Sequence, residues 1–285
     1  MAISSASLAY RRSALMTATK VSTKPPSQEV IEARDNFHAF CKIMGKAPAK
    51  HMLEWHNELC TGEDSECLLG IGGPNTSILA PRGSAKSTVL GLFAAWMIGR
   101  HAAAKKMLRI LYIAYMVDIS RAKSATIKGI LSSAKYREVF PMVRLSKIKR
   151  SDEYWSIDYE FAGIDTAGEE AFTVACGGLK GAITSKRSQL VLIDDPIKSA
   201  ASINNPDIRR EMEATWSNVI APTMFQGARA ICLGTRFHFD DIHATLFVPK
   251  NNWKQIVQKA VLTDEEGRSR SYWPEFWSMK YLNER

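Results

Sequence analysis

The sequence lacks any long uncharged apolar run. A membrane-spanning helix needs roughly 18 or more consecutive apolar residues, and the best candidate, residues 89–99, has only the length of a core helix. We therefore expect a soluble chain with no membrane partner. With 285 residues, of which 46% are apolar and 24% charged, it is long enough to bury a full core.

Paired cysteines are also missing. The chain has an odd number of cysteines and no C-x-x-C spacing; they are Cys41, Cys60, Cys67, Cys176 and Cys232. This pattern favours a reducing compartment and excludes the usual cysteine zinc sites. His238 and His243 have neither the spacing nor the intervening Glu of a zinc site, so we interpret them as structural.

Acidic residues are absent from the first 28 positions and rare between residues 100 and 150. The first segment is rich in Ser, Thr and Ala, as transit peptides are, but we interpret it as a flexible basic arm that ends near Pro25-Pro26. The second segment has thirteen Lys or Arg and two acids, an excess of 11 that exceeds the net charge of +9 of the whole chain. Such a stretch is typical of a polyanion-binding surface or of a solvated face.

Two glycines are missing from a stretch that otherwise has the form of a phosphate-binding loop. The usual pattern is G-x-x-x-x-G-K-[ST], whose backbone N–H groups surround phosphates while Lys neutralises charge and the hydroxyl holds Mg²⁺. Here Ala80 and Ala85 replace the glycines, Gly83 lies between them, and Lys86 and Ser87 are kept. An apolar strand before the loop and a helix after it would make an anion site. The alternative is an ordinary strand-to-helix turn.

Two adjacent carboxylates follow a second apolar strand. Residues 190–193 are apolar and lead into Asp194 and Asp195. In nucleotide hydrolases the first acid lies beside the Mg²⁺ shell and the second beside the attacking water, in the crevice at the carboxyl ends of the strands. The alternative is an edge strand that ends in an Asp-Asp-Pro turn. Asp195 is one methylene shorter than the commoner Glu, and Glu211 and Glu213 are fallback bases unless they are surface residues.

Two further segments have a functional and a structural interpretation. Thr235 and Arg236 follow an apolar strand, where a hydroxyl can sense a γ-phosphate through a hydrogen bond or simply cap a turn. Residues 51–56 place an aromatic side chain and polar groups before the loop, where adenine often packs in nucleotide hydrolases of this kind. They also fit an ordinary amphipathic helix with Trp55 in the core.

Strands and helices alternate along the middle of the chain. Helices are expected over residues 29–44, 51–59, 87–99 and 117–134, and strands over residues 76–80, 109–114, 171–176, 190–193, 228–233 and 254–260. Residues 150–168 form either a hairpin or an excursion from the sheet. The alternation predicts an α/β fold with a mostly parallel central sheet covered by helices on both faces. Together with the lysine loop and the acidic strand, it leads us to expect a P-loop NTPase of the ASCE type.

Taken in order, these motifs resemble the ATPase domain of the large terminase subunit of tailed bacteriophages, the motor that packages DNA into capsids. The resemblance covers most of residues 48–277. It rests on residues 51–58, the loop at 80–88, the acidic strand at 190–196, and residues 234–238 with Asp240. The Pro-Arg-Gly-x-Ala-Lys-Ser form of the loop is typical of one large branch of that family, so the missing glycines support the resemblance.

The resemblance implies ATP hydrolysis with Mg²⁺ as cofactor. Lys86, Arg82 and Asp195 would be catalytic, Ser87 and Asp194 would hold Mg²⁺, and Thr235 and Arg236 would couple hydrolysis to DNA movement. The nucleotide would lie against Pro81, Arg82, Gly83, Ser84, Ala85, Lys86, Ser87 and Thr88. An arginine from a neighbouring subunit would complete the site, with Arg121 and Arg187 as unranked candidates.

The resemblance also implies partners and a division of the chain. The partners would be double-stranded DNA, a portal protein, a small terminase subunit and further copies in a ring, expected to be a pentamer. The protein would lie in the host cytoplasm and transiently at the portal vertex of the procapsid. The division is an arm (1–28), an ATPase domain (29–265, with a helical part at 29–75 and a P-loop core at 76–265) and the start of a linker (266–285). Family members usually continue into an RNase H-like nuclease domain, which would be expected to begin near Arg285. We therefore expect no DNA cleavage by residues 1–285.

Two other function classes remain open. One is another ASCE nucleic-acid-dependent ATPase such as a helicase, which generally adds strand-separating motifs or a second RecA-like domain. The other is a non-hydrolysing DNA-binding protein with an inactive loop, which the lost glycines and the basic segment suggest.

Overall fold

The structure is a computed structural model that describes residues 25–60, 73–180 and 186–284. Most of the expected N-terminal arm and Cys67 lie outside these residues. Within them, no helix is both long enough and apolar enough to cross a membrane.

The elements alternate as the sequence predicts. The strands are β1 (Asn75–Leu79), β2 (Ile110–Ala114), β3 (Leu145–Arg150), β4 (Tyr154–Ile157), β5 (Val174–Gly178), β6 (Ser188–Asp194), β7 (Met224–Gly234), β8 (Trp253–Val257), β9 (Val261–Thr263) and β10 (Ser269–Ser271). The α-helices are α2 (Gln28–Asp35), α3 (Phe37–Ile43), α4 (Met52–Leu59), α5 (Lys86–Ala103), α6 (Val117–Ser132), α7 (Ala134–Val139), α8 (Tyr159–Ala162), α9 (Ala200–Ile203), α10 (Pro206–Thr215), α11 (Ile242–Thr245) and α12 (Met279–Asn283). Short π and 3-10 turns are η2 (Trp216–Ile220), η3 (Ala221–Thr223) and η4 (Pro249–Asn251).

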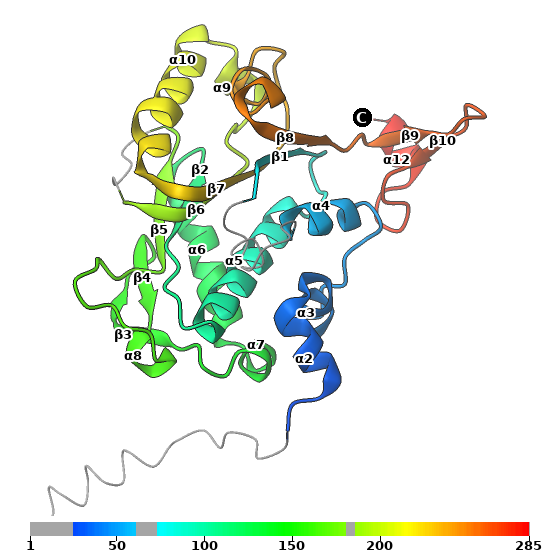
Figure 1. Ribbon diagram of the computed structural model, residues 1–285. Coiled ribbons are helices and arrows are strands. Elements are labelled where there is room, and N and C mark those ends of the chain that lie inside the picture. Colours follow the sequence, from blue (N-terminus) through cyan, green and yellow to red (C-terminus); the bar gives the residue numbers. More distant parts are fainter. Residues whose placement is uncertain (1–24, 61–72, 181–185, 285) are drawn as a thin grey trace, which may run out of the picture.

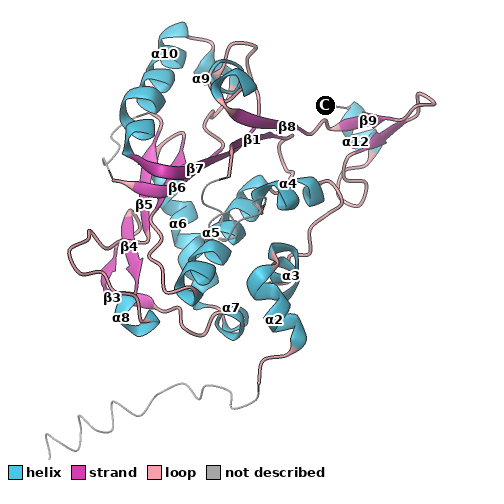
Figure 2. Cartoon of the chain, in the orientation of Figure 1, coloured by secondary structure: helices cyan, strands magenta, loops and turns pink. Residues whose placement is uncertain are grey.

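Eight strands form one sheet in the order β3-β4-β5-β2-β6-β7-β1-β8 (Figures 1 and 2). The six strands from β5 to β8 are parallel, whereas β4 pairs antiparallel with both β3 and β5. Strand β7 lies between β1, which leads into the phosphate-binding loop, and β6, which ends in the two acids. This is the mostly parallel α/β sheet of the ASCE P-loop fold that the sequence predicts.

The carboxyl ends of four neighbouring strands meet at one edge of the sheet. Leu79 of β1 is in register with Gly234 of β7, and Asp194 of β6 is in register with both Leu233 of β7 and Ala114 of β2. The loops after β1, β6 and β7 therefore leave the sheet side by side, where ligands bind in open α/β sheets.

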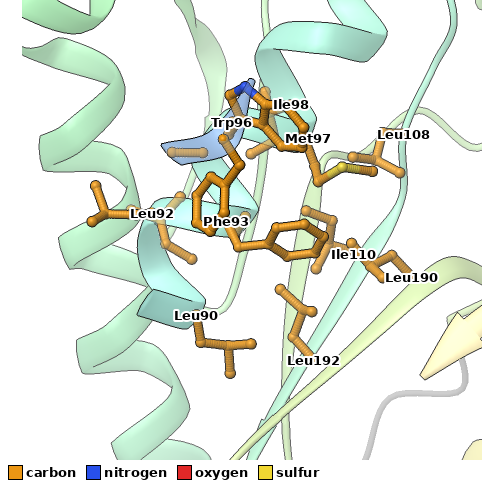
Figure 3. Packing of buried hydrophobic residues seen from close by; sticks show 14 of the residues in the cluster. Leu90, Leu92, Phe93, Trp96, Met97, Ile98, Leu108, Ile110, Leu190 and Leu192 are labelled. Carbon is orange, nitrogen blue, oxygen red and sulfur yellow. The ribbon is translucent and has the colours of Figure 1, made fainter. Parts of the chain in front are cut away.

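Helices cover both faces of the sheet because the parallel strands are apolar on both sides. In β6, Leu190 and Leu192 lie in the core beside apolar side chains of α5, as Figure 3 shows. Buried residues of the N-terminal helices, such as Phe37 and Phe40, belong to the same cluster. Val191 and Ile193 face the opposite core, with Met212 of α10. All four side chains are fully buried.

Several expected elements have different bounds in the structure: α5 continues to Ala103, and β8 ends at Val257. The helix expected over residues 29–44 is divided at Asn36, whose side chain caps α3 by accepting from Ala39 N at 3.0 Å. The strand expected over residues 171–176 is displaced to 174–178. The strand expected at 228–233 begins four residues earlier, at Met224. The stretch at 150–168 contributes to an antiparallel hairpin, β3–β4, followed by α8.

Candidate active site

The loop between β1 and α5 turns sharply because two residues adopt the left-handed backbone conformation. Ala80 N donates to Gly234 O at 3.0 Å and so still belongs to the sheet. Gly83 then has a φ of +77° and Ala85 a φ of +62°. Helix α5 begins at Lys86, so the unpaired N–H groups of its first turn lie at the loop. Such a helix start is suited to binding an anion.

Ala85 occupies the position of the second glycine of the usual pattern and also its left-handed conformation. The left-handed conformation costs a residue with a Cβ about 1–2 kcal/mol. Glycine avoids this cost but loses more conformational entropy on folding, so the net gain from replacing Ala85 with glycine is smaller. We expect Ala85→Gly to raise the free energy of unfolding by about 0.5–1 kcal/mol in urea titrations. The matched control is Ala122→Gly at an exposed site within α6. It should lower the free energy of unfolding by about 1 kcal/mol, and a decrease for both variants would contradict the strain at Ala85.

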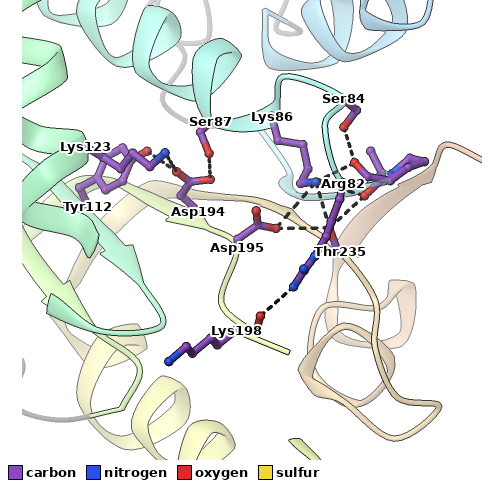
Figure 4. A network of polar contacts seen from close by, with 12 residues as sticks. Arg82, Ser84, Lys86, Ser87, Tyr112, Lys123, Asp194, Asp195, Lys198 and Thr235 are labelled. Atoms are coloured by element: carbon purple, nitrogen blue, oxygen red, sulfur yellow. Dashed lines mark hydrogen bonds and ion pairs between the residues drawn. The ribbon is translucent and has the colours of Figure 1, made fainter. Parts of the chain in front are cut away.

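The Lys86 ammonium lies at the centre of the strand ends (Figure 4). It donates to Ala80 O at 3.2 Å, to Pro81 O at 3.0 Å and to Thr235 Oγ1 at 2.9 Å, and its Nζ is 3.8 Å from Asp195 Oδ1. Burial lowers the pKa of Lys86, while the charges of Asp195 and Asp194 oppose that shift. The structure thus places a buried cation, with few competing solvent contacts, where the loop would receive phosphate oxygens.

Asp194 is the most enclosed acid of this cluster, with its side chain 1% exposed. Its Oδ1 accepts from Ser87 Oγ at 2.8 Å, and its Oδ2 accepts from Tyr112 Oη at 3.1 Å and lies 3.9 Å from Lys123 Nζ. Burial raises the pKa of Asp194, and the hydrogen bond from Ser87 and the charge of Lys123 counteract it. The carboxylate is held in a fixed orientation at the first turn of α5.

The residues present fit a magnesium ion. The Ser87 hydroxyl and the Asp194 carboxylate are oxygen ligands of the kind that hard cations prefer. Among the described residues, no cluster of three or more His, Cys, Asp or Glu forms a cage for a metal ion. A hydroxyl with one or two carboxylates suits Mg²⁺, which keeps several waters and shares its ligands with substrate phosphates.

Asp195 differs from its neighbour in conformation and in exposure. Its φ is +42°, its N donates to Leu233 O at 2.9 Å, and its side chain is 44% exposed. Thr235 Oγ1 lies 3.5 Å from Asp195 Oδ1 and 3.2 Å from Ala80 O. The left-handed turn directs the two consecutive acids to different partners, so Asp195 faces Lys86 and the open crevice.

The two arginines predicted for the site hold neighbouring loops in place. Arg82 donates to Lys198 O at 2.9 Å, and its guanidinium lies 4.9 Å from the centre of the Phe237 ring. It therefore ties the phosphate loop to the segments that follow β6 and β7. Arg236 donates to the carbonyl groups of residues 238 and 239 and so closes its own turn.

The candidate arginines and fallback bases have other partners. Arg121 pairs with Asp118 and Glu153, whereas Arg187 is exposed, with its guanidinium 5.9 Å from the centre of the Phe225 ring. Glu213 accepts from a threonine hydroxyl of α11, and Glu211 is exposed on α10. None of the four takes part in the hydrogen bonds and ion pairs around Lys86 and Asp194.

The two histidines that we interpreted as structural contact different partners. His243 is fully buried, with Nδ1 3.4 Å from Ser77 Oγ. His238 Nδ1 accepts from Asp240 N at 3.0 Å.

A segment from the end of the described chain packs on the phosphate loop. Trp277 Nε1 donates to Gly83 O at 3.4 Å. A Cβ placed on Gly83 would lie 2.4 Å from the Trp277 ring, so only glycine permits this approach. Residues at 266–284, expected to start a linker, thus form β10 and α12 and contact the candidate site.

His51 contacts the same loop from the N-terminal side. Its Nε2 lies 3.5 Å from Ser84 O. The centre of its ring lies 4.9 Å from that of the Tyr272 ring and 5.0 Å from that of the Trp273 ring. Trp55 is fully buried in the core, as an amphipathic helix with a core tryptophan requires.

Three residues near the site were not anticipated, namely Tyr112, Lys123 and Trp277. Tyr112 is a polar group in an otherwise apolar strand, two residues before its carboxyl end, and this pattern could have drawn attention to it. Lys123 and Trp277 show no such pattern, because only the packing of α6 and of the C-terminal segment brings them to the site.

Solved ATPase domains of phage packaging proteins are similar in structure to this chain. The ATPase domain of the large terminase of Thermus phage P74-26, in a mutant form, aligns at 15% identity with a TM-score of 0.44, over 78% of this chain and 85% of that one. The large terminase of a thermophilic bacteriophage in complex with ATPγS aligns at 10% identity with a TM-score of 0.41, over 91% of this chain and 48% of that one. The N-terminal domain of the DNA packaging ATPase of bacteriophage phi29 aligns at 15% identity with a TM-score of 0.35, over 60% of this chain and 78% of that one.

The chain spans about half the length of the terminase solved with ATPγS. No protein-family model and no curated protein matches the chain. At these identities and TM-scores the comparisons carry no argument about the site, whose chemistry stands on its own residues.

Proposed function

We propose that the chain is the ATP-hydrolysing motor domain of a viral DNA-packaging terminase, which translocates double-stranded DNA into a procapsid. The observation that carries the proposal is the contact network of Lys86, Ser87, Asp194, Asp195 and Thr235 at the ends of three neighbouring strands. These residues belong to the motifs by which the sequence resembles terminase ATPase domains.

Each residue of the network has a role in phosphoryl transfer. Lys86 exchanges its loop carbonyl partners for γ-phosphate oxygens and stabilises the charge that develops there. Ser87 and Asp194 would hold Mg²⁺, which would neutralise phosphate charge when bound. Asp195, the exposed acid, orients the attacking water, and Thr235 contacts both Lys86 and Asp195, so its hydrogen bonds change when the γ-phosphate leaves.

The loop arginines and the assembled ring complete the proposal. Arg82 releases Lys198 O to contact phosphate, or changes partners with the nucleotide state. Thr235 and Arg236 transmit hydrolysis to DNA movement. A neighbouring subunit of a pentameric ring supplies a further arginine, for which Arg187 has the accessible guanidinium and Arg121 is held by two carboxylates. The ring acts with a small terminase subunit in the host cytoplasm and docks on the portal protein at the procapsid vertex.

Double-stranded DNA is the polyanion that we assign to the basic segment. Acids from elsewhere in the chain neutralise part of its charge, because Arg109 pairs with Glu169 and Lys128 with Asp152. Other cations of the segment are exposed, including Lys106, Lys135, Lys147 and Arg150. Binding through these groups would release counterions and weaken as salt is raised.

The decisive experiment measures ATP hydrolysis with and without blunt double-stranded DNA, across a salt series. We expect Mg²⁺-dependent hydrolysis that DNA stimulates, with stimulation declining as salt rises. A strand-displacement assay in parallel separates the helicase alternative, which requires unwinding. Calorimetry with ATP and Mg²⁺ separates the non-hydrolysing alternative, which requires that no nucleotide binds to the loop.

A further inference from the structure

A cavity of about 330 Å³ lies between α5 and α6, next to the candidate active site. Ser87 and Tyr112, which both donate to the Asp194 carboxylate, form part of its wall. Thr88 and Gly91 continue the wall along α5, and Lys123 and Lys46 line it from α6 and from the loop after α3. The cavity therefore adjoins the magnesium-binding oxygens and shares only Ser87 and Thr88 with the phosphate-binding motif at 80–88.

The charge and the polar groups of this cavity favour an anion. Its lining contains two lysines and no acid. Among the described residues, the partner of Lys123 Nζ is the carboxylate of Asp194, at 3.9 Å. Within the part of the chain that the structure describes, no acceptor or acid is in contact with the Lys46 ammonium. The hydroxyls of Thr88 and Thr126 add hydrogen-bonding groups, and the volume is at the lower end for small-molecule sites, so the ligand is small.

Gly91 supports a ligand in this position. It lies buried within α5, where glycine destabilises a helix relative to alanine. A Cβ at Gly91 would meet no atom within 4 Å, whereas a Cβ at Gly99 of the same helix would lie 2.3 Å from Phe140. Packing within the chain thus requires glycine at 99 but not at 91. The bare backbone at 91 leaves room for a group that approaches the helix.

We propose that this cavity binds inorganic phosphate and is the route by which the phosphate product leaves the active site. The proposal rests on the proposed function, because hydrolysis of ATP by water yields ADP and inorganic phosphate beside Ser87 and Asp194. Lys46 and Lys123 pair with the phosphate dianion, and Thr88 donates a hydrogen bond. Among the described residues that line the cavity, none belongs to the loop at 80–86, so the ligand that we assign is the free ion rather than a nucleotide phosphate group.

The test uses inorganic phosphate as the probe and the full chain carrying Lys86→Ala, which weakens phosphate binding at the loop. Phosphorus NMR line broadening measures its affinity with and without ADP and Mg²⁺. We expect binding to persist with ADP present, to weaken about tenfold in Lys46→Ala through loss of a charged hydrogen bond, and to be lost in Gly91→Leu, which fills the cavity. Gly91→Ala, which adds one methyl group, should weaken binding less than Gly91→Leu does, and Lys106→Ala, at an exposed site, should stay within twofold. Thermal unfolding checks that each variant is folded.

A second readout does not depend on Lys86→Ala. In the otherwise unchanged chain, phosphate should inhibit ATP hydrolysis, with an inhibition constant about tenfold higher in Lys46→Ala. Equal phosphate affinity in Lys46→Ala, Gly91→Leu and their controls would overturn the proposal, as would displacement of phosphate by ADP. If Lys46-dependent binding is found in a chain that hydrolyses no ATP, the proposed function fails while the anion site stands. If Lys86→Ala reduces ATP hydrolysis but Lys46→Ala leaves phosphate affinity unchanged, only the assignment of the cavity fails.

Discussion

Replacing Lys86 with alanine should reduce ATP hydrolysis at least 100- to 1,000-fold. Removing one preorganised group that stabilises transition-state charge costs roughly that factor. Lys86 is such a group, because its buried ammonium contacts the loop carbonyls and lies 3.8 Å from Asp195. Steady-state hydrolysis with saturating Mg²⁺ and DNA measures the change. Nucleotide binding, measured by calorimetry, should weaken as well, since the ammonium is at the phosphate end of the loop.

The control for Lys86→Ala is Lys106→Ala, which removes the same charge at an exposed position outside the site. It should change hydrolysis less than twofold. Unfolding curves are needed for Lys86→Ala, because Ala80 O and Pro81 O lose a donor there. Normal hydrolysis by a folded Lys86→Ala variant would show that the loop is not the catalytic site.

The strand ends show which part of this site can be predicted from sequence. Apolar runs that end in Asp194 and Gly234 identify buried parallel strands, and the carboxyl ends of such strands share an edge. The meeting of Lys86, Ser87 and Asp194 therefore follows from pattern and spacing, although the two motifs are more than 100 residues apart.

Other features of the site depend on tertiary packing that leaves no local pattern. The contact of Arg82 with Lys198 O joins residues 116 positions apart, and that of Trp277 with Gly83 joins residues 194 positions apart. Nothing in the short-range sequence around either partner specifies these pairs. Ala85 is intermediate between these two groups. Its position in the motif can be identified from the sequence, but its left-handed conformation is known only from the structure.

The packing of the C-terminal segment suggests how the loop keeps its shape. Trp277 reaches Gly83 from one side, and His51, supported by Tyr272 and Trp273, reaches Ser84 from the other. A loop that has lost both motif glycines still contains two left-handed residues, and these aromatic contacts offset part of their conformational cost. The loop conformation is thus a property of the whole domain rather than of the motif alone.

Replacing Asp195 with asparagine should strongly reduce turnover while preserving the binding of ATP. Asparagine tolerates the left-handed backbone that Asp195 adopts, at φ +42°, so the turn after β6 should remain intact. Loss of a general base or water-orienting carboxylate typically costs about 10²- to 10⁴-fold in rate. Binding should be equal or tighter, because the variant removes a negative charge 3.8 Å from Lys86, where the phosphates would lie. Single-turnover hydrolysis and calorimetry measure the two quantities separately.

The matched control is Glu213→Gln, which makes the same charge change at the alternative base. Glu213 accepts a hydrogen bond from Thr245 on the other side of the sheet, so its loss should change the rate less than twofold. If Glu213→Gln stops turnover and Asp195→Asn does not, the water is activated by another acid, and the roles of the two carboxylates at the end of β6 must be reassigned. If Asp195→Asn instead loses ATP binding and turnover together, its carboxylate supports the phosphate or metal site rather than the water. The ratio of the effects on turnover and on ATP binding thus decides what the exposed acid does.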